Sequence, residues 1–310
     1  MILTVTPNVA LDVTYRVDRL VPGAAHRVRE VAERAGGKGV NVARILHALG
    51  HDTVALGFVG DAAAAAVADD LDRAGLAHRL IPVAGPTRRS VTVVAGDGEA
   101  TMFSEPGPPV PAPSWRALEA LLAGSLPEAA ALVVSGSLPP GADDDACARL
   151  VRLAAAHQVP VLVDAVGAAL LGAAEAGADV VKPNASELVA TTGRADVAAA
   201  AEALRRRGAR AVVASRGAAG MTAFTPEGCW HAAPPARLVG NPTGSGDAAA
   251  AALVAGAVAG APWPDRLRDA VALSAAAVLQ PTAGSVDLAQ ARRLRPQVVV
   301  EDHHGAGLDR

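Results

Sequence analysis

The sequence predicts an α/β protein in which an open, mostly parallel sheet is joined by a smaller inserted sheet. Short apolar stretches alternate with Ala-rich helical stretches along most of the 310 residues. Two alternating stretches, 88–95 and 100–104, are joined by the turn residues 96–99 and predict a β-hairpin among the α/β units. Polar loops recur directly after strands, which is where an open parallel sheet binds its ligands.

The composition excludes several classes of function. The chain is 51% hydrophobic, 19% charged and 2% aromatic, with a formal net charge of -3, so it lacks the basic face of a nucleic-acid-binding protein. Cys147 and Cys229 are too few and too far apart for a disulfide framework or a zinc site. The first residues lack the basic start of a signal peptide, and apolar runs are broken before they could span a membrane. We therefore expect a cytoplasmic protein that binds neither membranes nor nucleic acid.

In the first half, a strand and helix pattern is interrupted by the small sheet. The residues 36–41 open a helix that Gly50 ends, and the hairpin together with residues 12–17 is expected to form a lid. The other expected elements are strands at 2–6, 11–17, 53–59 and 79–83, and a helix at 61–74.

The second half alternates more regularly. The expected strands are 130–135, 159–164, 179–182 and 210–214, with a hairpin at 221–225 and 229–232. The expected helices are 143–157, 187–191, 197–207, 248–260 and 264–279. The tail from Glu301 is expected to be disordered.

The stretch Asn241–Asp247 carries the strongest chemical signal. Gly244, Ser245 and Gly246 lead into an Ala-rich helix, so backbone N–H groups and the helix dipole could hold a phosphoryl group there. Asp247 in the first turn could accept the proton of an attacking hydroxyl. The simpler interpretation is a tight turn followed by a charge at a helix start.

A second glycine-rich stretch offers a ligand site near the N-terminus. Gly37 allows close approach to the backbone, Lys38 brings a cation and Asn41 a paired donor and acceptor. Because Gly39 stands where a serine or threonine must follow the lysine, this is not a Walker A loop. A glycine-rich turn that opens a helix would look the same. Asp12 fits either a sugar-hydroxyl acceptor or a surface charge.

Five motifs in order give the chain a family resemblance: 36–41, 135–141, 182–187, 215–220 and 244–247. From Thr4 to about Gly284 it resembles a PfkB-type, ribokinase-like sugar kinase, in the branch that holds 1-phosphofructokinases and tagatose-6-phosphate kinases. The resemblance implies one kinase domain over 1–310 with a three-layer α/β/α fold and a central, mostly parallel sheet. It also implies a small β lid from about 11–33 and 86–105, through which a homodimer could form.

The resemblance implies ATP-dependent phosphorylation of a hexose phosphate, foremost fructose 1-phosphate to fructose 1,6-bisphosphate. Mg²⁺ would assist, and K⁺ is a further candidate cofactor. Tagatose 6-phosphate, fructose 6-phosphate and an unphosphorylated hexose or polyol are the alternative acceptors. The implied residues fall into four groups: Asp247 as base with Gly244, Ser245 and Gly246 as anion hole; Asp12, Gly37, Lys38, Asn41, Arg88 and Ser137 at the sugar; Lys182, Asn184, Ser215, Gly217 and Gly220 at ATP; and Glu187 with Asn184 near the metal, through water.

Some residues depart from the sugar-phosphate pattern or fit rival chemistry. Ser90 and Thr92 stand on the lid strand where relatives of the 1-phosphofructokinase type typically have Asn and Lys, which leaves the acceptor open. Residues 244–249 loosely match the dinucleotide fingerprint G-x-G-x-x-A of dehydrogenases, with Asp265 near the required distance. A sensor that keeps the fold without turnover is a third possibility, although such a protein should lack Asp247 or Glu187.

Overall fold

The structure is a computed structural model that describes residues 1–236, 238 and 240–303, with only the backbone of Asp61 and Ala62. Its larger sheet has ten strands. In spatial order these are β14 (Val299–Asp302), β13 (Gly228–Ala233), β12 (Met221–Thr225), β11 (Ala211–Ser215), β10 (Val180–Val181), β9 (Val161–Asp164), β8 (Ala131–Ser135), β1 (Ile2–Thr6), β4 (Thr53–Gly60) and β5 (Ala77–Val83).

The sheet is mostly parallel, as predicted. Every pairing from β5 across to β11 is parallel, and the pairings β11–β12, β12–β13 and β13–β14 are antiparallel. All five residues of β1 and all five of β8 are buried, as expected for parallel strands covered on both faces. This confirms the three-layer α/β/α fold.

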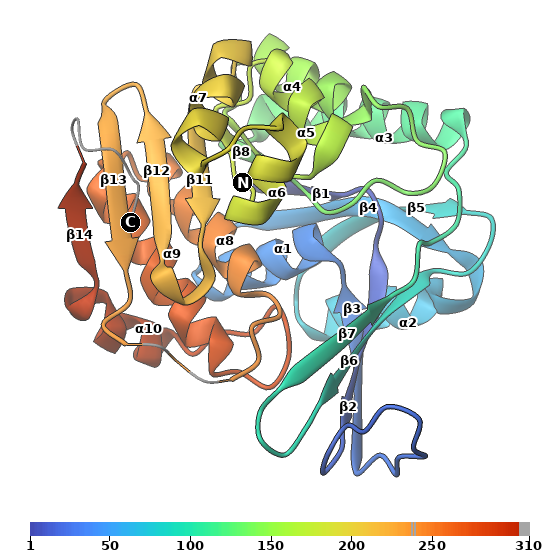
Figure 1. Ribbon diagram of the computed structural model, residues 1–310. Coiled ribbons are helices and arrows are strands. Elements are labelled where there is room, and N and C mark those ends of the chain that lie inside the picture. Colours follow the sequence, from blue (N-terminus) through green and yellow to red (C-terminus); the bar gives the residue numbers. More distant parts are fainter. Residues whose placement is uncertain (237, 239, 304–310) are drawn as a thin grey trace.

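Helices cover both faces of the larger sheet (Figure 1). The helices on one face are α1 (Lys38–Ala48), α2 (Asp61–Arg73), α8 (Ser245–Val258), α9 (Trp263–Val278) and α10 (Leu288–Leu294). Those on the other are α3 (Ala112–Ser125), α4 (Ala146–Ala156), α5 (Gly167–Glu175), α6 (Ala185–Thr192) and α7 (Val197–Arg207). The run Ala248–Ala252 is buried in α8, and its small side chains let that helix lie close to both the sheet and α9.

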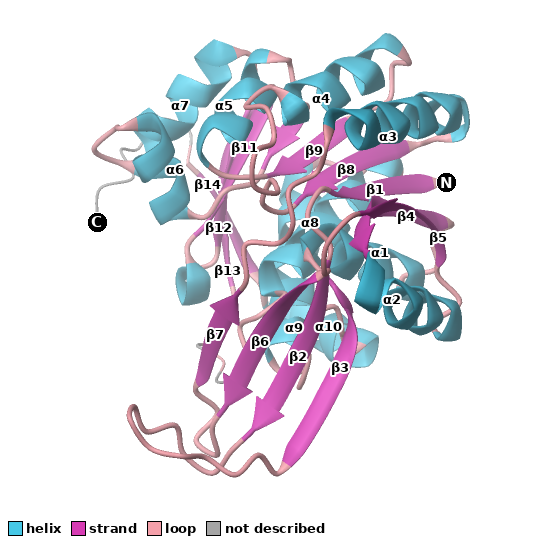
Figure 2. Cartoon of the chain, turned by 90° about the vertical axis from the view of Figure 1, so that its right-hand side faces the viewer, coloured by secondary structure: helices cyan, strands magenta, loops and turns pink. Residues whose placement is uncertain are grey.

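The small sheet contains four strands and projects from the body of the molecule (Figure 2). In spatial order they are β3 (Glu30–Gly36), β2 (Ala10–Arg16), β6 (Arg88–Val94) and β7 (Ala100–Ser104). β2 and β6 pair in parallel, whereas the two outer pairings are antiparallel. The sequence analysis predicted β2 and the β6–β7 hairpin, but it named no strand at β3.

The predicted disorder from Glu301 is wrong for the first three residues of that segment. Glu301 and Asp302 belong to β14 and pair with His231 and Trp230 of β13. The strand extends the antiparallel edge of the larger sheet, and its backbone hydrogen bonds supply the order that a charged sequence did not suggest. The His303 N–H then donates to the Cys229 carbonyl oxygen at 2.8 Å, and the rest of the predicted tail, 304–310, lies outside the described residues. Within the described part, no helix is long and apolar enough to cross a membrane.

Candidate active site

The start of α8 carries the candidate catalytic residue. Gly244 precedes the helix in the left-handed conformation, with φ of 84°, and α8 has no side-chain cap. A side chain at Gly244 would lie 3.0 Å from the Gly284 nitrogen and from the Ala283 Cα. The turn therefore requires glycine. The Ser245 N–H donates to the Pro242 carbonyl oxygen at 3.2 Å, which leaves the N–H groups of Gly246 and Asp247 in the first helical turn to bind an anion.

Asp247 lies in that first turn and is 5% exposed. The Asn41 Nδ2 donates a hydrogen bond of 3.0 Å to its Oδ2. Burial raises the pKa of the Asp247 carboxyl to about 6, although Lys38 acts against this shift and Asp164 adds to it. A carboxylate in this state is ionised near neutral pH and can still take up a proton.

Beside Asp247, two lysines share one buried carboxylate. Asp164 ends β9 and is 3% exposed, with its two oxygens 2.9 Å from Lys38 Nζ and 2.8 Å from Lys182 Nζ. Burial alone would raise the pKa of Asp164, but Lys182 and then Lys38 outweigh it and hold that pKa below its usual range. The cluster thus brings two cations and one anion to the carboxyl ends of the strands.

Asn184 and Glu187 form a capping box at the start of α6. The Glu187 backbone N–H donates to Asn184 Oδ1, the Asn184 backbone N–H donates to Glu187 Oε2, and both distances are 2.8 Å. Asn184 also forms an isolated parallel bridge with Ser215 at the end of β11. Among the described residues, no group of three or more His, Cys, Asp or Glu side chains could hold a metal ion directly.

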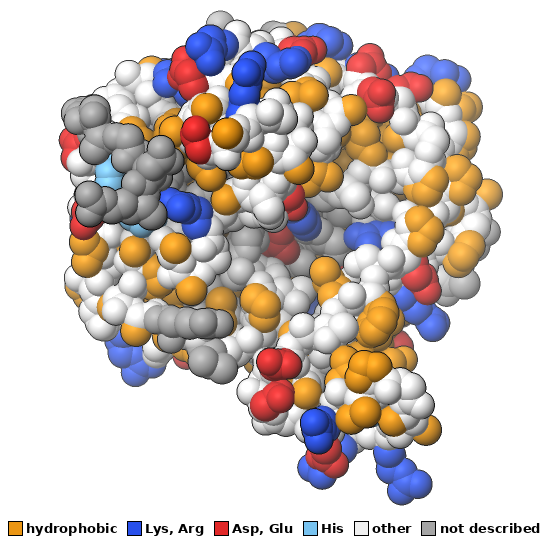
Figure 3. Space-filling view, viewed as in Figure 1, with side chains coloured by type: hydrophobic (Ala, Val, Ile, Leu, Met, Phe, Trp, Pro, Cys, Tyr) orange, Lys and Arg blue, Asp and Glu red, His pale blue; other side chains and the backbone are white. Residues whose placement is uncertain are grey.

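A cavity of about 710 Å³ lies beside the first turn of α8. Its volume falls within the size range of small-molecule sites. Figure 3 shows the hollow between the body and the small sheet, with acidic and basic side chains on its floor. Five predicted site residues line the cavity, namely Ser215, Gly217, Gly220, Ser245 and Gly246. Residues 97–101, from the tip of the β6–β7 hairpin, line it as well. Lys182 does not line it, because its ammonium group is buried against Asp164.

The small sheet contributes a second charged cluster. The strand register places Asp12 opposite Arg34 on β3. Arg88 pairs with Ala10, two positions from Asp12, and therefore lies on the same face of the sheet. Burial raises the pKa of Asp12 to about 6, while Arg88, Asn41 and Arg34 act against the shift. Asn41 thus interacts with both Asp12 and Asp247, so these two carboxylates belong to one site.

Two further predicted residues, Ser137 and Gly37, lie just after β8 and β3. Asn8 Nδ2 approaches Ser137 Oγ at 3.4 Å, and Arg88 Nε donates to the Asn8 carbonyl oxygen at 3.0 Å. Gly37 precedes α1 with φ of 94°, and a Cβ there would lie 2.9 Å from Thr6 Cγ2. The structure therefore brings the predicted sugar-binding residues around the starts of β2 and α1.

Three residues of the site were missed by sequence reasoning. Asp164 belongs to no motif, although it ends a strand as Ser135 and Ser215 do. Arg34 lies on the unpredicted β3, where its Nη1 donates to Thr282 Oγ1, the Ala283 carbonyl oxygen and Ser285 Oγ at 3.0, 3.1 and 2.7 Å. Asn8, which is 6% exposed, gave no signal beyond its place after a strand.

The dehydrogenase alternative does not fit this geometry. The dinucleotide fingerprint requires a strand that turns directly into the helix, within a β-α-β unit. The strand that precedes α8 is β13, which ends at Ala233 and pairs antiparallel with both of its neighbours. The glycines at 244 and 246 therefore do not serve a dinucleotide fold.

An uncapped helix start beside a buried carboxylate suits the transfer of a phosphoryl group to an alcohol, because moving charge needs fixed positive potential and a nearby proton acceptor. Fold and site thus define a phosphotransferase. The model of the pfkB family of carbohydrate kinases matches residues 5–290, and the chain belongs to this family. It is therefore an enzyme with a hydroxyl group as acceptor, and the predicted resemblance is confirmed.

Three relatives illustrate the similarity. The chain is 38% identical over 274 residues to a 1-phosphofructokinase of Haloferax volcanii, covering 86% of this chain and 88% of the relative. It is 33% identical over 305 residues to a 1-phosphofructokinase of Vibrio cholerae, covering 96% of each. The crystal structure of phosphofructokinase-2 from Escherichia coli in complex with potassium has a TM-score of 0.87 and 27% identity, covering 95% of this chain and 98% of that one.

Proposed function

We propose that the protein transfers the γ-phosphoryl group of ATP to the primary hydroxyl of fructose 1-phosphate and forms fructose 1,6-bisphosphate. The observation that carries this proposal is the buried Asp247 at the uncapped start of α8, next to a cavity large enough for a nucleotide. The choice of acceptor rests on the similarity to 1-phosphofructokinases, of which the two described above are 38% and 33% identical to this chain.

In the proposed reaction, Asp247 accepts the proton of the acceptor hydroxyl. The hydroxyl oxygen forms a bond to the γ-phosphorus while the bond from that phosphorus to the bridging oxygen of ADP breaks. In the proposed anion hole from Gly244 to Asp247, the N–H groups of Gly246 and Asp247 would neutralise the charge on the transferred group, because the Ser245 N–H already donates to the Pro242 carbonyl oxygen. With a pKa of about 6, the carboxylate is ionised at neutral pH, so it is ready to act.

The 710 Å³ cavity is the proposed nucleotide site. Ser215, Gly217 and Gly220 would line it for ATP, and Lys182 would add positive potential from beneath Gly246. A Cβ at Gly246 would lie 3.5 Å from Lys182 Nζ, so the lysine is close to the anion hole. When bound, Mg²⁺ would neutralise the nucleotide phosphates.

Asn184 and Glu187 suit an indirect role toward that metal. Each uses one side-chain oxygen in the capping box, which leaves the second carboxylate oxygen of Glu187 for a metal-bound water. K⁺ is proposed as a further cofactor on the basis of the potassium complex of the E. coli relative.

The sugar phosphate would lie under the small sheet. Asp12, Gly37, Lys38, Asn41 and Ser137 surround the proposed place of the sugar hydroxyls, and Arg88 would bind the existing phosphate. Arg34 adds a second guanidinium on the same face as Arg88. This second cation could replace the lysine that relatives of this type carry where this chain has Thr92, whose side chain is buried here.

We further propose that residues 1–310 form a single kinase domain and that the small sheet, from about 11–33 and 86–105, closes over the sugar. A homodimer through this sheet is supported by three exposed apolar side chains on its outer strands: Val31, Met102 and Phe103 at 55%, 55% and 57% exposure. The cytoplasmic location stays a prediction.

The substrate is tested by coupled ADP release with a panel of sugars. Fructose 1-phosphate should give the highest kcat/KM, ahead of fructose 6-phosphate, tagatose 6-phosphate and free fructose. Activity on free fructose without activity on its phosphates would refute the choice of acceptor. An unphosphorylated hexose is the second candidate, because Ser90 and Thr92 place no cation on their part of β6.

A further inference from the structure

A second cavity lies at the amino ends of the central strands of the larger sheet, opposite the candidate active site at their carboxyl ends. Its volume is about 480 Å³, which falls within the range of small-molecule sites. It is lined by the first residues of four parallel strands, Ala131, Val161, Val180 and Ala211. The same strands end at the phosphoryl-transfer site, so the two cavities occupy opposite ends of one sheet.

The walls of this cavity are apolar and aromatic. Leu162, Leu253 and Val254 form part of them, together with the partly buried Trp230 and Trp263. The chain has only three tryptophans, and the third, Trp115, packs against Phe58 in the core. Two of three tryptophans at one cavity, in a chain with 2% aromatic residues, provide flat surfaces for a ligand.

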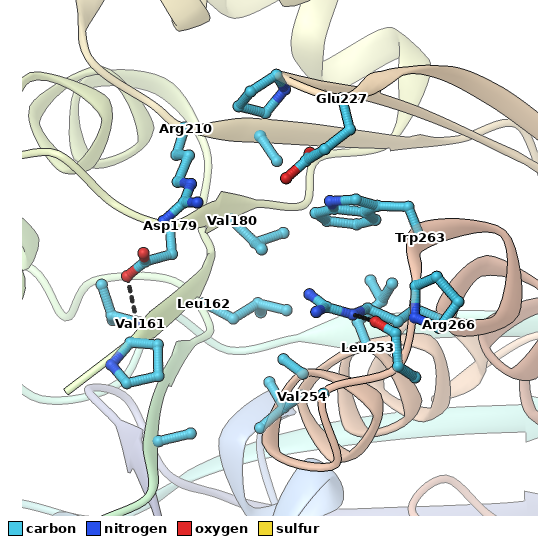
Figure 4. Close-up of a pocket in the computed structure, with 18 of the residues that line it drawn as sticks. Val161, Leu162, Asp179, Val180, Arg210, Glu227, Leu253, Val254, Trp263 and Arg266 are labelled. Carbon is cyan, nitrogen blue, oxygen red and sulfur yellow. Dashed lines mark hydrogen bonds between the residues drawn. The ribbon is translucent and has the colours of Figure 1, made fainter.

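Arg266 points into the cavity in a fixed orientation. Figure 4 shows its guanidinium group reaching the centre of the cavity beneath the Trp263 ring. Its Cζ lies 5.1 Å from the centroid of that ring, and its Nε donates to the Ala261 carbonyl oxygen at 2.5 Å. Neither Nη group of Arg266 forms a hydrogen bond or ion pair within the part of the chain that the structure describes. They form a preoriented pair of donors.

The other charges around the cavity limit what this pair can bind. Arg210 lies on the wall that faces Arg266 (Figure 4). Burial is the main cause of the lowered pKa of Arg266; Arg210 lowers this pKa further, and Glu227 raises it. Asp179 already accepts the Val161 N–H at 2.8 Å through Oδ2. Asp179 and Glu227 reduce the positive potential of Arg210 and Arg266, so a second negative charge on a ligand bound at Arg266 would gain little.

We propose that this cavity binds a small organic monocarboxylate. The carboxylate would accept hydrogen bonds from the two Nη groups of Arg266 and face Arg210, while a flat or apolar body would pack between Trp230, Trp263 and Leu253. The site shares no lining residue with the 710 Å³ cavity, and helix α8 runs between the two. The inference is therefore independent of the sugar that the enzyme phosphorylates.

Calorimetric titration of the full chain with benzoate and pyruvate tests the site, with benzamide and inorganic phosphate as comparison ligands. At least one carboxylate should bind saturably and quench tryptophan fluorescence, while benzamide and phosphate should bind at least about tenfold more weakly. Saturating ATP should leave the affinity for the carboxylate unchanged. Equal binding of benzamide, failure of both carboxylates to bind, or their displacement by ATP would overturn the proposal.

Two variants locate the binding. Arg266→Lys keeps the charge but loses the paired donors, and Arg210→Gln removes an exposed cation with little effect on the fold, so each should weaken carboxylate binding about tenfold. Arg292→Gln is the control, because Arg292 is an exposed arginine on α10 outside the cavity lining. Unchanged affinity in the Arg210 variant, or equal loss in the Arg292 variant, would contradict the assignment.

Discussion

Replacing Asp247 by asparagine should stabilise the protein while it removes the proposed base. Burial raises the pKa of this carboxyl from its ordinary 3.8 to about 6, so holding it ionised in the folded state costs roughly 3 kcal/mol. The neutral form stabilises the fold below the unfolded-state pKa, and this contribution is lost as the pH rises through about 6. Asp247→Asn should therefore raise the free energy of unfolding by roughly 3 kcal/mol at pH 8.

Urea unfolding between about pH 4 and pH 8 measures this gain. It should grow from about pH 4 to pH 6 and level off above about pH 7, because wild-type Asp247 is then fully ionised. Asp143→Asn is the matched control: this aspartate side chain is 73% exposed, and its replacement should change stability by less than about 0.5 kcal/mol. An Asp247 variant less stable than wild type at pH 8, or a gain independent of pH, would refute the reasoning.

Two further substitutions probe the surroundings of Asp247. Asp164→Asn leaves the buried Lys182 without its counter-charge and should lower the free energy of unfolding by about 3–5 kcal/mol in urea; a loss below about 1 kcal/mol would contradict the ion-pair account. Gly284→Ala places a Cβ 2.6 Å from Asn41 Oδ1 at a φ of 69° and should lower kcat more than Gly141→Ala, where φ is 72° and the space is open. Equal kcat in both glycine variants would mean that the position of the Asn41 side chain does not matter for catalysis.

The motifs made much of the site predictable. The stretch Gly244–Asp247 combines glycine, which the left-handed turn requires, with a carboxylate in the first helical turn, and both features are local. Polar residues after strands were expected to meet at one edge, because parallel strands end together. Asn184 and Ser215 do so, because an isolated parallel bridge joins Asn184 to Ser215 at the end of β11.

What the sequence could not show depends on tertiary contacts. The strand β3 carries its charges at Glu30, Glu33 and Arg34, so its sequence lacks the regular apolar alternation of a half-buried strand, and it is ordered by pairing with β2. Arg34 was missed with it. Asp164 becomes significant only when Lys38, from more than a hundred residues earlier, reaches it across the sheet. Strand β14 was missed because its charged end is stabilised by backbone pairing with β13.

The central claim is that Asp247 takes the proton from the acceptor hydroxyl. The most direct test is single-turnover phosphoryl transfer from ATP to fructose 1-phosphate by Asp247→Asn, with ATP affinity measured on the same preparation. Transfer should slow by at least about 10²-fold with ATP affinity nearly unchanged, since a general base contributes about 10²–10⁴-fold. Transfer at the wild-type rate by a variant that folds and binds ATP would contradict the account.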